Sequence, residues 1–323
     1  MILIETLGRQ KPRKHEKYER LIAATTGLPP LDTAVAYPCD ATSLGATCEA
    51  AEARMIRPVL VGPESTMKRV ANQQKLDISK FEIVDVRDGA ATAAAAAVDL
   101  VRRGKAELLM KGSLHSDELL SAVAKRETGL RTARRLSHVF IMDVPTHPET
   151  LFITDAVVNI APDLLAKRDI IQNAIDLFLA LDLGTPKIAI LSAVETVTPT
   201  IPSTVEAAAL CKMAERGQIT GGVLDGPLAF DNAVSLEAAH IKGIRSEVAG
   251  KAQVLVVPNL EAGNMLAKNL TFLSQADAAG VVLGARVPIV LTSRADNLRT
   301  RLASCAVAMI SAHSQRAKAP VRN

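Results

Sequence analysis

Runs of apolar residues with strand character alternate with runs of helical spacing along most of the chain. Strands that alternate with helices at such intervals are typical of α/β proteins, whose sheets are mostly parallel and flanked by helices. The sequence therefore predicts an α/β fold. The predicted strands cover residues 33–38, 57–63, 80–86, 106–112, 187–193 and 221–228, and the predicted helices cover 43–56, 88–104, 116–129, 163–184, 201–219 and 297–315.

Two details of this pattern give sharper predictions. Residues 138–145 and 150–159 are predicted to be strands joined by a short turn, which would make an antiparallel excursion in an otherwise parallel arrangement. Ser43 is predicted to cap the helix that follows it, because a hydroxyl oxygen accepts hydrogen bonds from the free N–H groups of a first helical turn.

The composition sets the size and kind of the core. The chain has 323 residues, which is long for one core and sufficient for two lobes. Apolar residues make up 48% of it and aromatic residues only 2%, so the core must consist of aliphatic side chains and alanine. Such a core favours helices packed on sheets over a β-sandwich.

The charge and the termini exclude several classes of protein. The formal net charge of +4 is too small and too dispersed for a nucleic-acid-binding face, but it suits small anionic substrates. No apolar run approaches the roughly 18 residues that a membrane span needs. The N-terminus lacks the pattern of a signal peptide. We therefore expect a cytoplasmic protein with no membrane or nucleic-acid partner.

The cysteines do not form a metal site or a disulfide framework. Cys39, Cys48, Cys211 and Cys305 contain no CxxC pair and have no His at ligand spacing. We predict reduced thiols, with Cys211 and Cys305 on apolar helix faces. Neither a metal nor a cofactor is expected.

A polar cluster follows the apolar run that ends at Leu291. Thr292, Ser293, Arg294 and Asp296 come directly before the last predicted helix. One interpretation is that they cap this helix. The other is that the hydroxyl, the free N–H groups of the helix start and the guanidinium together bind an anion such as phosphate.

Other predicted strands also end in polar residues, and in open α/β sheets ligands bind beyond the carboxyl ends of strands. Lys111, Gly112 and Ser113 follow one of these strands. Gly112 would let a ligand approach the backbone, and Lys111 would add a second cation. Alternatively, Lys111 forms an ion pair with a surface carboxylate.

Several motifs together resemble one known family. The segments "KGSLHSDELL", "DGPLAFD", "NLEAGNML" and "TSRAD" occur in this order, and the similarity extends from about Lys14 to Ala312. Their combination resembles the phosphate acetyltransferase/phosphate butyryltransferase family, and "KGSLHSDELL" and "TSRAD" resemble its butyryltransferase-like branch.

The resemblance implies a fold, an assembly and a reaction. The fold would be the two-lobed α/β fold of isocitrate and isopropylmalate dehydrogenases. Residues 1–145 plus 295–323 would form the first lobe and residues 146–294 the second, with the active site in the cleft between them. The protein would be a homodimer that converts acyl-CoA and phosphate reversibly into acyl phosphate and coenzyme A, with coenzyme A as a substrate.

The resemblance also assigns roles to residues. Arg294 would bind phosphate, and Ser293 would orient the carbonyl or the phosphate. The remaining positions that match family motifs would contact substrate or shape the site. They are Lys111, Gly112, Ser113, His115, Asp225, Gly263 and Asn264. His115 has a second interpretation as a structural residue at a helix start.

Two positions depart from the family pattern. The acetyltransferase branch carries an acid six residues after the arginine, where this chain has Thr300. Asp296 would replace this acid as the base for the thiol, or else it caps the final helix. Ser121 stands where an arginine is often found, and Arg131 or Arg134 would supply the missing cation.

Two other functions compete with acyl transfer. The departures at Thr300 and Ser121 suit an acyl-CoA sensor that binds without turnover. A metal- and NAD-dependent dehydrogenase would use the same scaffold. However, Asp155, Asp225 and Asp231 lack the Asp-x-x-x-Asp spacing that its metal requires.

Overall fold

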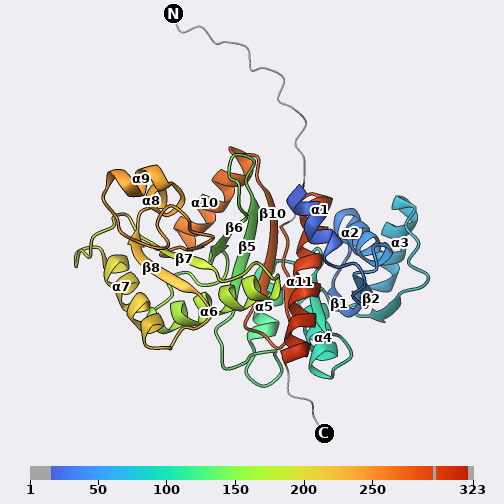
Figure 1. The fold of residues 1–323 in the computed structure, drawn as a ribbon. Coiled ribbons are helices and arrows are strands. Elements are labelled where there is room, and N and C mark those ends of the chain that lie inside the picture. Colours follow the sequence, from blue (N-terminus) through green and yellow to red (C-terminus); the bar gives the residue numbers. More distant parts are fainter. Residues whose placement is uncertain (1–15, 294–295, 319–323) are drawn as a thin grey trace, which may run out of the picture.

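The chain folds around one continuous sheet, as the computed structural model shows for the residues that it describes, 16–293 and 296–318. The sheet has eleven strands in the order β3-β2-β1-β4-β11-β10-β5-β6-β9-β7-β8. Figure 1 shows it running through the whole molecule. The strands are β1 (Leu31–Ala36), β2 (Ile56–Gly62), β3 (Glu82–Asp85), β4 (Leu108–Lys111), β5 (Ser137–Asp143), β6 (Leu151–Thr154), β7 (Lys187–Leu191), β8 (Val223–Leu228), β9 (Val254–Val256), β10 (Asp277–Leu283) and β11 (Ile289–Val290).

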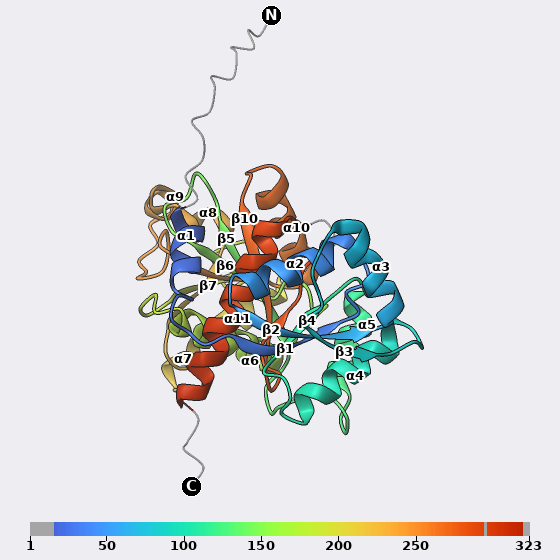
Figure 2. The same ribbon diagram turned by 90° about the vertical axis from the view of Figure 1, so that its right-hand side faces the viewer.

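Helices cover both faces of this sheet. In Figure 2 the first four strands lie between α2 and α3 on one side and α4 and α5 on the other. The long helix α11 packs on β10 and β11 near the middle of the sheet. The helices are α1 (Glu16–Ala23), α2 (Ala41–Glu52), α3 (Glu64–Gln74), α4 (Ala90–Arg102), α5 (Ser116–Ala124), α6 (Leu164–Ala180), α7 (Pro202–Glu215), α8 (Phe230–Val234), α9 (Leu236–Ile241), α10 (Leu260–Phe272) and α11 (Leu298–Lys318).

The predicted α/β class and the antiparallel excursion are both confirmed. Strands β3, β2, β1, β4 and β11 are parallel to their neighbours, as are β6, β9, β7 and β8. Between these two groups, β10 pairs antiparallel with β11 and β5, and β5 pairs antiparallel with β6. The excursion therefore joins the two parallel halves.

The two faces of the sheet are packed differently. Alternate strand residues point to opposite faces, so that Val35 and Phe152 join one core while Ala34 and Ile153 join others. One face carries a single core that extends under α2, α6, α7 and α11. The opposite face carries two cores, one under α4 and α5 and the other under α8, α9 and α10. The two-lobed character of the fold is visible on this second face.

Two local predictions are wrong in their details. Asp40, not Ser43, caps α2, since its Oδ1 accepts the Ser43 N–H at 2.7 Å. The strand predicted over 150–159 ends at Thr154, because the buried Asp155 carboxylate accepts hydrogen bonds from the N–H groups of the next residues and turns the chain.

The remaining global predictions concern the thiols and the membrane. All four cysteines are free, and Cys305 is buried in α11. Within the described ranges, no helix is both long and apolar enough to cross a membrane. The division of the chain into lobes at residues 145 and 294 stays a prediction.

Candidate functional site

The carboxyl ends of β1, β4 and β11 lie side by side at one edge of the sheet. Ala36 pairs with Lys111, and Met110 pairs with Val290. The loops that follow these three strands are therefore neighbours, although they come from distant parts of the sequence. They include most of the residues predicted to act around phosphate.

Gly112 and Ser113 bind the end of β1. The Gly112 N–H donates to the Ala36 carbonyl at 2.9 Å, and the Ser113 hydroxyl donates to the Tyr37 carbonyl at 2.8 Å. A Cβ on Gly112 would lie 2.4 Å from the Ala36 oxygen. The approach of β1 alone therefore requires glycine at this position, and the approach of a ligand to this backbone stays a prediction.

Lys111 connects this edge to the polar cluster after β11. Its side chain is buried, and its Nζ donates to the Thr292 carbonyl at 3.3 Å. The ammonium group is therefore not on the surface, and its charge opposes the effect of burial, which raises the pKa of the nearby Asp296 carboxyl. Lys111 contributes a buried positive charge beside the segment that carries Ser293.

Thr292, Ser293, Asp296 and Asn297 precede α11, which begins at Leu298, and Ser293 and Asp296 are hydrogen-bonded to each other; we refer to these four residues as the turn at Ser293. The Ser293 N–H donates to Asp296 Oδ2 at 2.6 Å, which closes the turn. Asn297 caps α11, since its Oδ1 accepts the Thr300 N–H at 2.9 Å. The alternative that Asp296 caps the helix is therefore wrong, whereas an anion site just before the helix stays a prediction. Arg294, predicted to bind phosphate, lies outside the described residues.

The environment of Asp296 suits a proton acceptor. Burial raises the pKa of its carboxyl, and this effect is opposed by the hydrogen bond from Ser293 and by the charges of Arg301 and Lys111. A carboxylate whose pKa is raised is a better base than an exposed one. Ser293 itself is exposed, and its N–H is hydrogen-bonded to this carboxylate.

Arg301 was not predicted, yet it makes extensive contacts with this turn. It is 3% exposed and extends from the first turns of α11. It donates to Thr292 Oγ1 at 3.0 Å, to the Ser293 carbonyl at 2.7 Å and to the Asp296 carbonyl at 3.2 Å. The signal in the sequence was an arginine at a position where the helical pattern calls for an apolar residue.

His138 in β5 contacts the residue that precedes Thr292. Its ring is fully buried and hydrogen-bonded to the backbone of Leu291, while Nδ1 has no partner. Burial lowers the pKa of this imidazole to about 3, so the ring is neutral at pH 7. It packs against Phe140 with the ring centroids 4.3 Å apart.

Three other predicted residues come from the first half of the chain. His115 is an exposed residue at the start of α5, and its N–H donates to Glu118 Oε2 at 2.7 Å. Arg131 is exposed and forms a bridge with Ala285, beyond the carboxyl end of β10. The antiparallel strand β11 runs towards the amino end of β10, so the chain after β11 continues away from Ala285. Arg134 forms an ion pair with Asp176 at 2.7 Å.

Gly263 and Asn264 position α10 against the turn after β6. A Cβ on Gly263 would lie 2.9 Å from Ala156 Cβ, and Asn264 Nδ2 donates to the Ala156 carbonyl at 3.4 Å. Asp225 lies in the outermost strand β8, where its carboxylate helps to raise the pKa of the Cys211 thiol to about 12, after the larger effect of burial. The structure does not bring Asp225 to the turn at Ser293.

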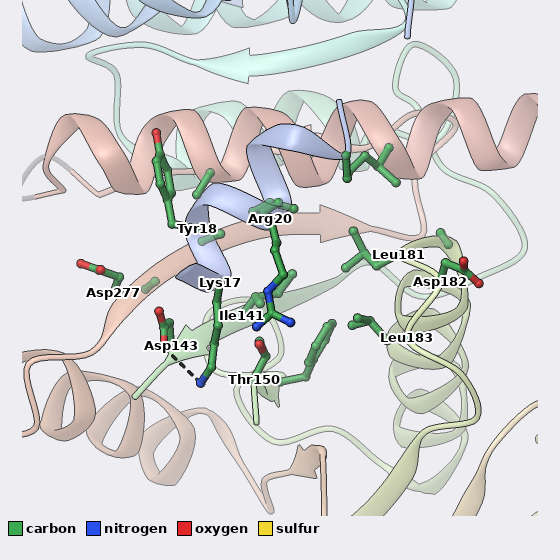
Figure 3. Close-up of a pocket in the computed structure, with 18 of the residues that line it drawn as sticks. Lys17, Tyr18, Arg20, Ile141, Asp143, Thr150, Leu181, Asp182, Leu183 and Asp277 are labelled. Carbon is green, nitrogen blue, oxygen red and sulfur yellow. Dashed lines mark ion pairs between the residues drawn. The ribbon is translucent and has the colours of Figure 1, made fainter. Parts of the chain in front are cut away.

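A cavity of about 560 Å³ lies on the single-core face of the sheet, between α1, α11 and the end of α6. Figure 3 shows Lys17, Tyr18 and Arg20 of α1 over Ile141 and Leu183, with the ion pair between Lys17 and Asp143. Thr300 lines this cavity, whereas the next residue, Arg301, binds the turn at Ser293.

No cluster of three or more His, Cys, Asp and Glu side chains within residues 16–293 and 296–318 is arranged to hold a metal ion. The chemistry available at the turn is hydrogen bonding, positive charge and one basic carboxylate. These groups suit the binding of a small oxyanion and the transfer of a proton.

Comparison with known proteins gives a consistent result. The family model for phosphate acetyl/butaryl transferase matches residues 89–309. A phosphate acetyltransferase from Rhizobium meliloti is 68% identical over 306 residues, which cover 95% of this chain and 96% of that protein. A phosphate butyryltransferase from Clostridium beijerinckii is 40% identical over 91% of this chain and 97% of its own length.

Solved structures agree with this result. A branched-chain phosphotransacylase from Enterococcus faecalis V583 superposes with a TM-score of 0.76 at 31% identity, over 88% of this chain and 99% of that one. A 4-hydroxythreonine-4-phosphate dehydrogenase from Klebsiella pneumoniae has a TM-score of 0.53 at 13% identity, over 88% of this chain and 99% of that one. The second likeness concerns the fold alone and confirms the predicted dehydrogenase-like architecture.

Proposed function

Because this chain belongs to the phosphate acetyl/butaryl transferase family, we propose that it is a phosphate acyltransferase, which converts acyl-CoA and inorganic phosphate reversibly into acyl phosphate and coenzyme A. The observation that carries this proposal is the 68% identity to a phosphate acetyltransferase across 95% of the chain. That identity also favours acetyl as the acyl group, since the butyryltransferase relative is only 40% identical.

The chemistry needs no covalent intermediate on the protein. In one direction a phosphate oxygen attacks the thioester carbonyl, the C–S bond breaks, and the thiolate leaves. In the other direction the thiolate attacks the carbonyl of the acyl phosphate, and phosphate leaves. A thiolate is a strong nucleophile, so the protein has to position the two substrates and stabilise the tetrahedral oxyanion between them.

The residues around the turn would have different roles in this reaction. Ser293, exposed beside Asp296, would orient the carbonyl or the phosphate through its hydroxyl. Asp296 would accept the proton of the coenzyme A thiol and return it in the opposite direction, which its raised pKa favours. The assignment of Arg294 to phosphate rests on its match to the family motif. Lys111 adds positive charge from the buried side.

A homodimer is part of the proposal. Large apolar side chains are exposed on α9 and on and just after α10, where a second copy of the chain would cover them. They are Leu236, Ile241, Met265, Phe272 and Leu273, which are between 57% and 78% exposed. Sedimentation of the purified protein tests this proposal. The cytoplasmic location and the absence of a cofactor stay predictions.

The decisive experiment measures thiol release from acyl-CoA with and without phosphate, over a series from acetyl to hexanoyl. We expect phosphate-dependent release that is fastest with acetyl-CoA, and a loss of several orders of magnitude in Arg294→Ala. Acyl-CoA binding without phosphate-dependent release would identify a sensor instead. Activity that requires a divalent metal and a nicotinamide nucleotide would indicate a dehydrogenase.

A further inference from the structure

Three consecutive backbone carbonyls after β11 are each bound by a buried side chain from a different element. The ring of His138 in β5 donates through Nε2–H to the carbonyl of Leu291, since this hydrogen bond opposes the lowering of the imidazole pKa by burial, as a bond to an acceptor does, and Nδ1 has no partner. Lys111 in β4 donates to the carbonyl of residue 292, and Arg301 in α11 donates to the carbonyl of residue 293.

Arg301 makes the most contacts of the three. Its Nε and its two terminal nitrogens bind three different acceptors, on Thr292, Ser293 and Asp296. These acceptors stand on both sides of positions 294 and 295 in the sequence. A planar guanidinium presents its donors in a rigid fork. One side chain therefore fixes Thr292 and Ser293 relative to Asp296.

We propose that Arg301 is a positioning residue for acyl transfer: by binding Thr292, Ser293 and Asp296 at once, it holds Ser293 and the Asp296 carboxylate in the arrangement that the phosphate substrate requires. This inference rests on the proposed function. Arg301 itself is buried, and it acts through the turn without touching substrate.

The physical basis is that water cannot readily replace Arg301 at the Thr292 hydroxyl. Thr292 is 4% exposed, so its hydroxyl is shielded from solvent and relies on the guanidinium as its hydrogen-bond partner. A buried acceptor without a partner costs about 1–3 kcal/mol, which the segment would avoid by moving towards water. A displacement on the order of 1 Å at a reacting group is enough to lower a rate by about 100-fold.

Arg299 provides a matched control on the same helix. It lies two residues before Arg301, lines the cavity of Figure 3 and approaches Asp277 at 3.8 Å. Removing its guanidinium changes the charge of α11 by the same amount but leaves the turn untouched. The two arginines therefore separate positioning from a general effect of charge.

The test uses Arg301→Ala, Arg301→Met, Arg301→Lys and Arg299→Met in the full chain. For Arg301→Met we expect kcat/KM for phosphate to fall by about 100-fold, with the KM for acetyl-CoA and the circular dichroism spectrum unchanged. Arg301→Lys should recover part of this loss. Guanidinium ion at millimolar concentration should restore Arg301→Ala but not Arg301→Met, whose side chain fills the space. Arg299→Met should behave like the wild type.

A second measurement does not depend on activity. Hydrogen exchange of a peptide covering residues 291–297 reports whether the Ser293 N–H is still protected by Asp296. We expect faster exchange in Arg301→Met and Arg301→Ala and unchanged exchange in Arg299→Met. Unchanged exchange in the Arg301 variants, or equal losses of phosphate and acetyl-CoA kinetics, would overturn the inference. If the wild type transfers no acyl group while exchange responds as expected, the proposed function fails and Arg301 is left with a structural role alone.

Discussion

Arg301 and Lys167 are two buried cations with opposite kinds of partner. Arg301 is 3% exposed and binds a hydroxyl and backbone carbonyls, whereas Lys167 is 4% exposed and pairs with the Glu206 carboxylate between α6 and α7. An ion pair consists of two side chains, and mutation can remove both. Backbone carbonyls cannot be removed, so the turn at Ser293 depends on its cation in a way that the α6–α7 contact does not.

The difference in partners also determines how much each of the two cations contributes to the electrostatic potential around it. The charge of Lys167 is neutralised by the carboxylate beside it, so it adds little at a distance. The hydrogen-bond acceptors of Arg301 are uncharged oxygens, and a second cation, Lys111, binds the same turn. Arg301 and Lys111 thus place two positive charges near the Asp296 carboxylate, and positive charge favours an anionic substrate.

The largest effect is expected from removing one partner of the ion pair. Glu206→Ala leaves the Lys167 ammonium buried without its counter-charge, which should lower the free energy of unfolding by about 3 kcal/mol. Urea denaturation followed by circular dichroism measures this loss. The specific activity of the folded protein should not change. A loss below about 1 kcal/mol would show that water already reaches the ammonium group.

The next effect concerns the carboxylate at the turn. Asp296→Asn keeps an acceptor for the Ser293 N–H but removes the base, so kcat should fall by about 100-fold with the fold intact. Because burial raises the pKa of Asp296, the activity of the wild type should decline on acidification at a higher pH than that of an ordinary aspartate. Steady-state rates of both proteins across the acidic range test this. A wild-type pH profile retained by Asp296→Asn would remove Asp296 from the mechanism.

The buried, neutral ring of His138 should make the stability of the protein depend on pH. Its pKa is lowered from 6.5 to about 3 by burial, so the unfolded chain takes up a proton that the folded chain does not. The contribution of this group to stability is therefore present at pH 7 and is lost as the pH falls from 6.5 towards 3. Between pH 7 and pH 5 it should cost about 2 kcal/mol of unfolding free energy. His138→Gln should reduce this dependence in urea denaturation at the two pH values. An identical dependence in the variant would show that other groups cause it.

The smallest effect is expected where both charges are replaced. Lys167→Met combined with Glu206→Leu should leave the free energy of unfolding within about 1 kcal/mol of the wild type, because apolar side chains can substitute for a buried ion pair. Thermal unfolding measures the difference. A large loss in this double variant would contradict the distinction drawn between the two cations.

Much of the fold could be predicted because hydropathy periodicity reports directly on burial. The alternation of strands and helices identified the α/β class, and the "THPE" turn identified the antiparallel pair β5 and β6. The residue that caps a helix could not be identified from the sequence in the same way. Asp40 and Ser43 are both suitable capping residues, and only the backbone geometry decides between them.

The site was predictable only in part, for a physical reason. Ser293, Asp296 and Lys111 follow strands, and a rule based on strand ends can find them. The partners of Arg301 and His138 include backbone atoms, and every residue has the same carbonyl and N–H groups, so no sequence motif marks them. The sequence could not show that β1 excludes a side chain at Gly112, because this contact joins residues far apart in the chain.

The continuous sheet, with one core on one face and two on the other, limits how the molecule can move. Separating the two halves would break the backbone hydrogen bonds between β10 and β5. The single core resists shear because its side chains interlock across the whole span. We therefore expect any relative movement of the two halves to bend the sheet at this ladder without dividing it.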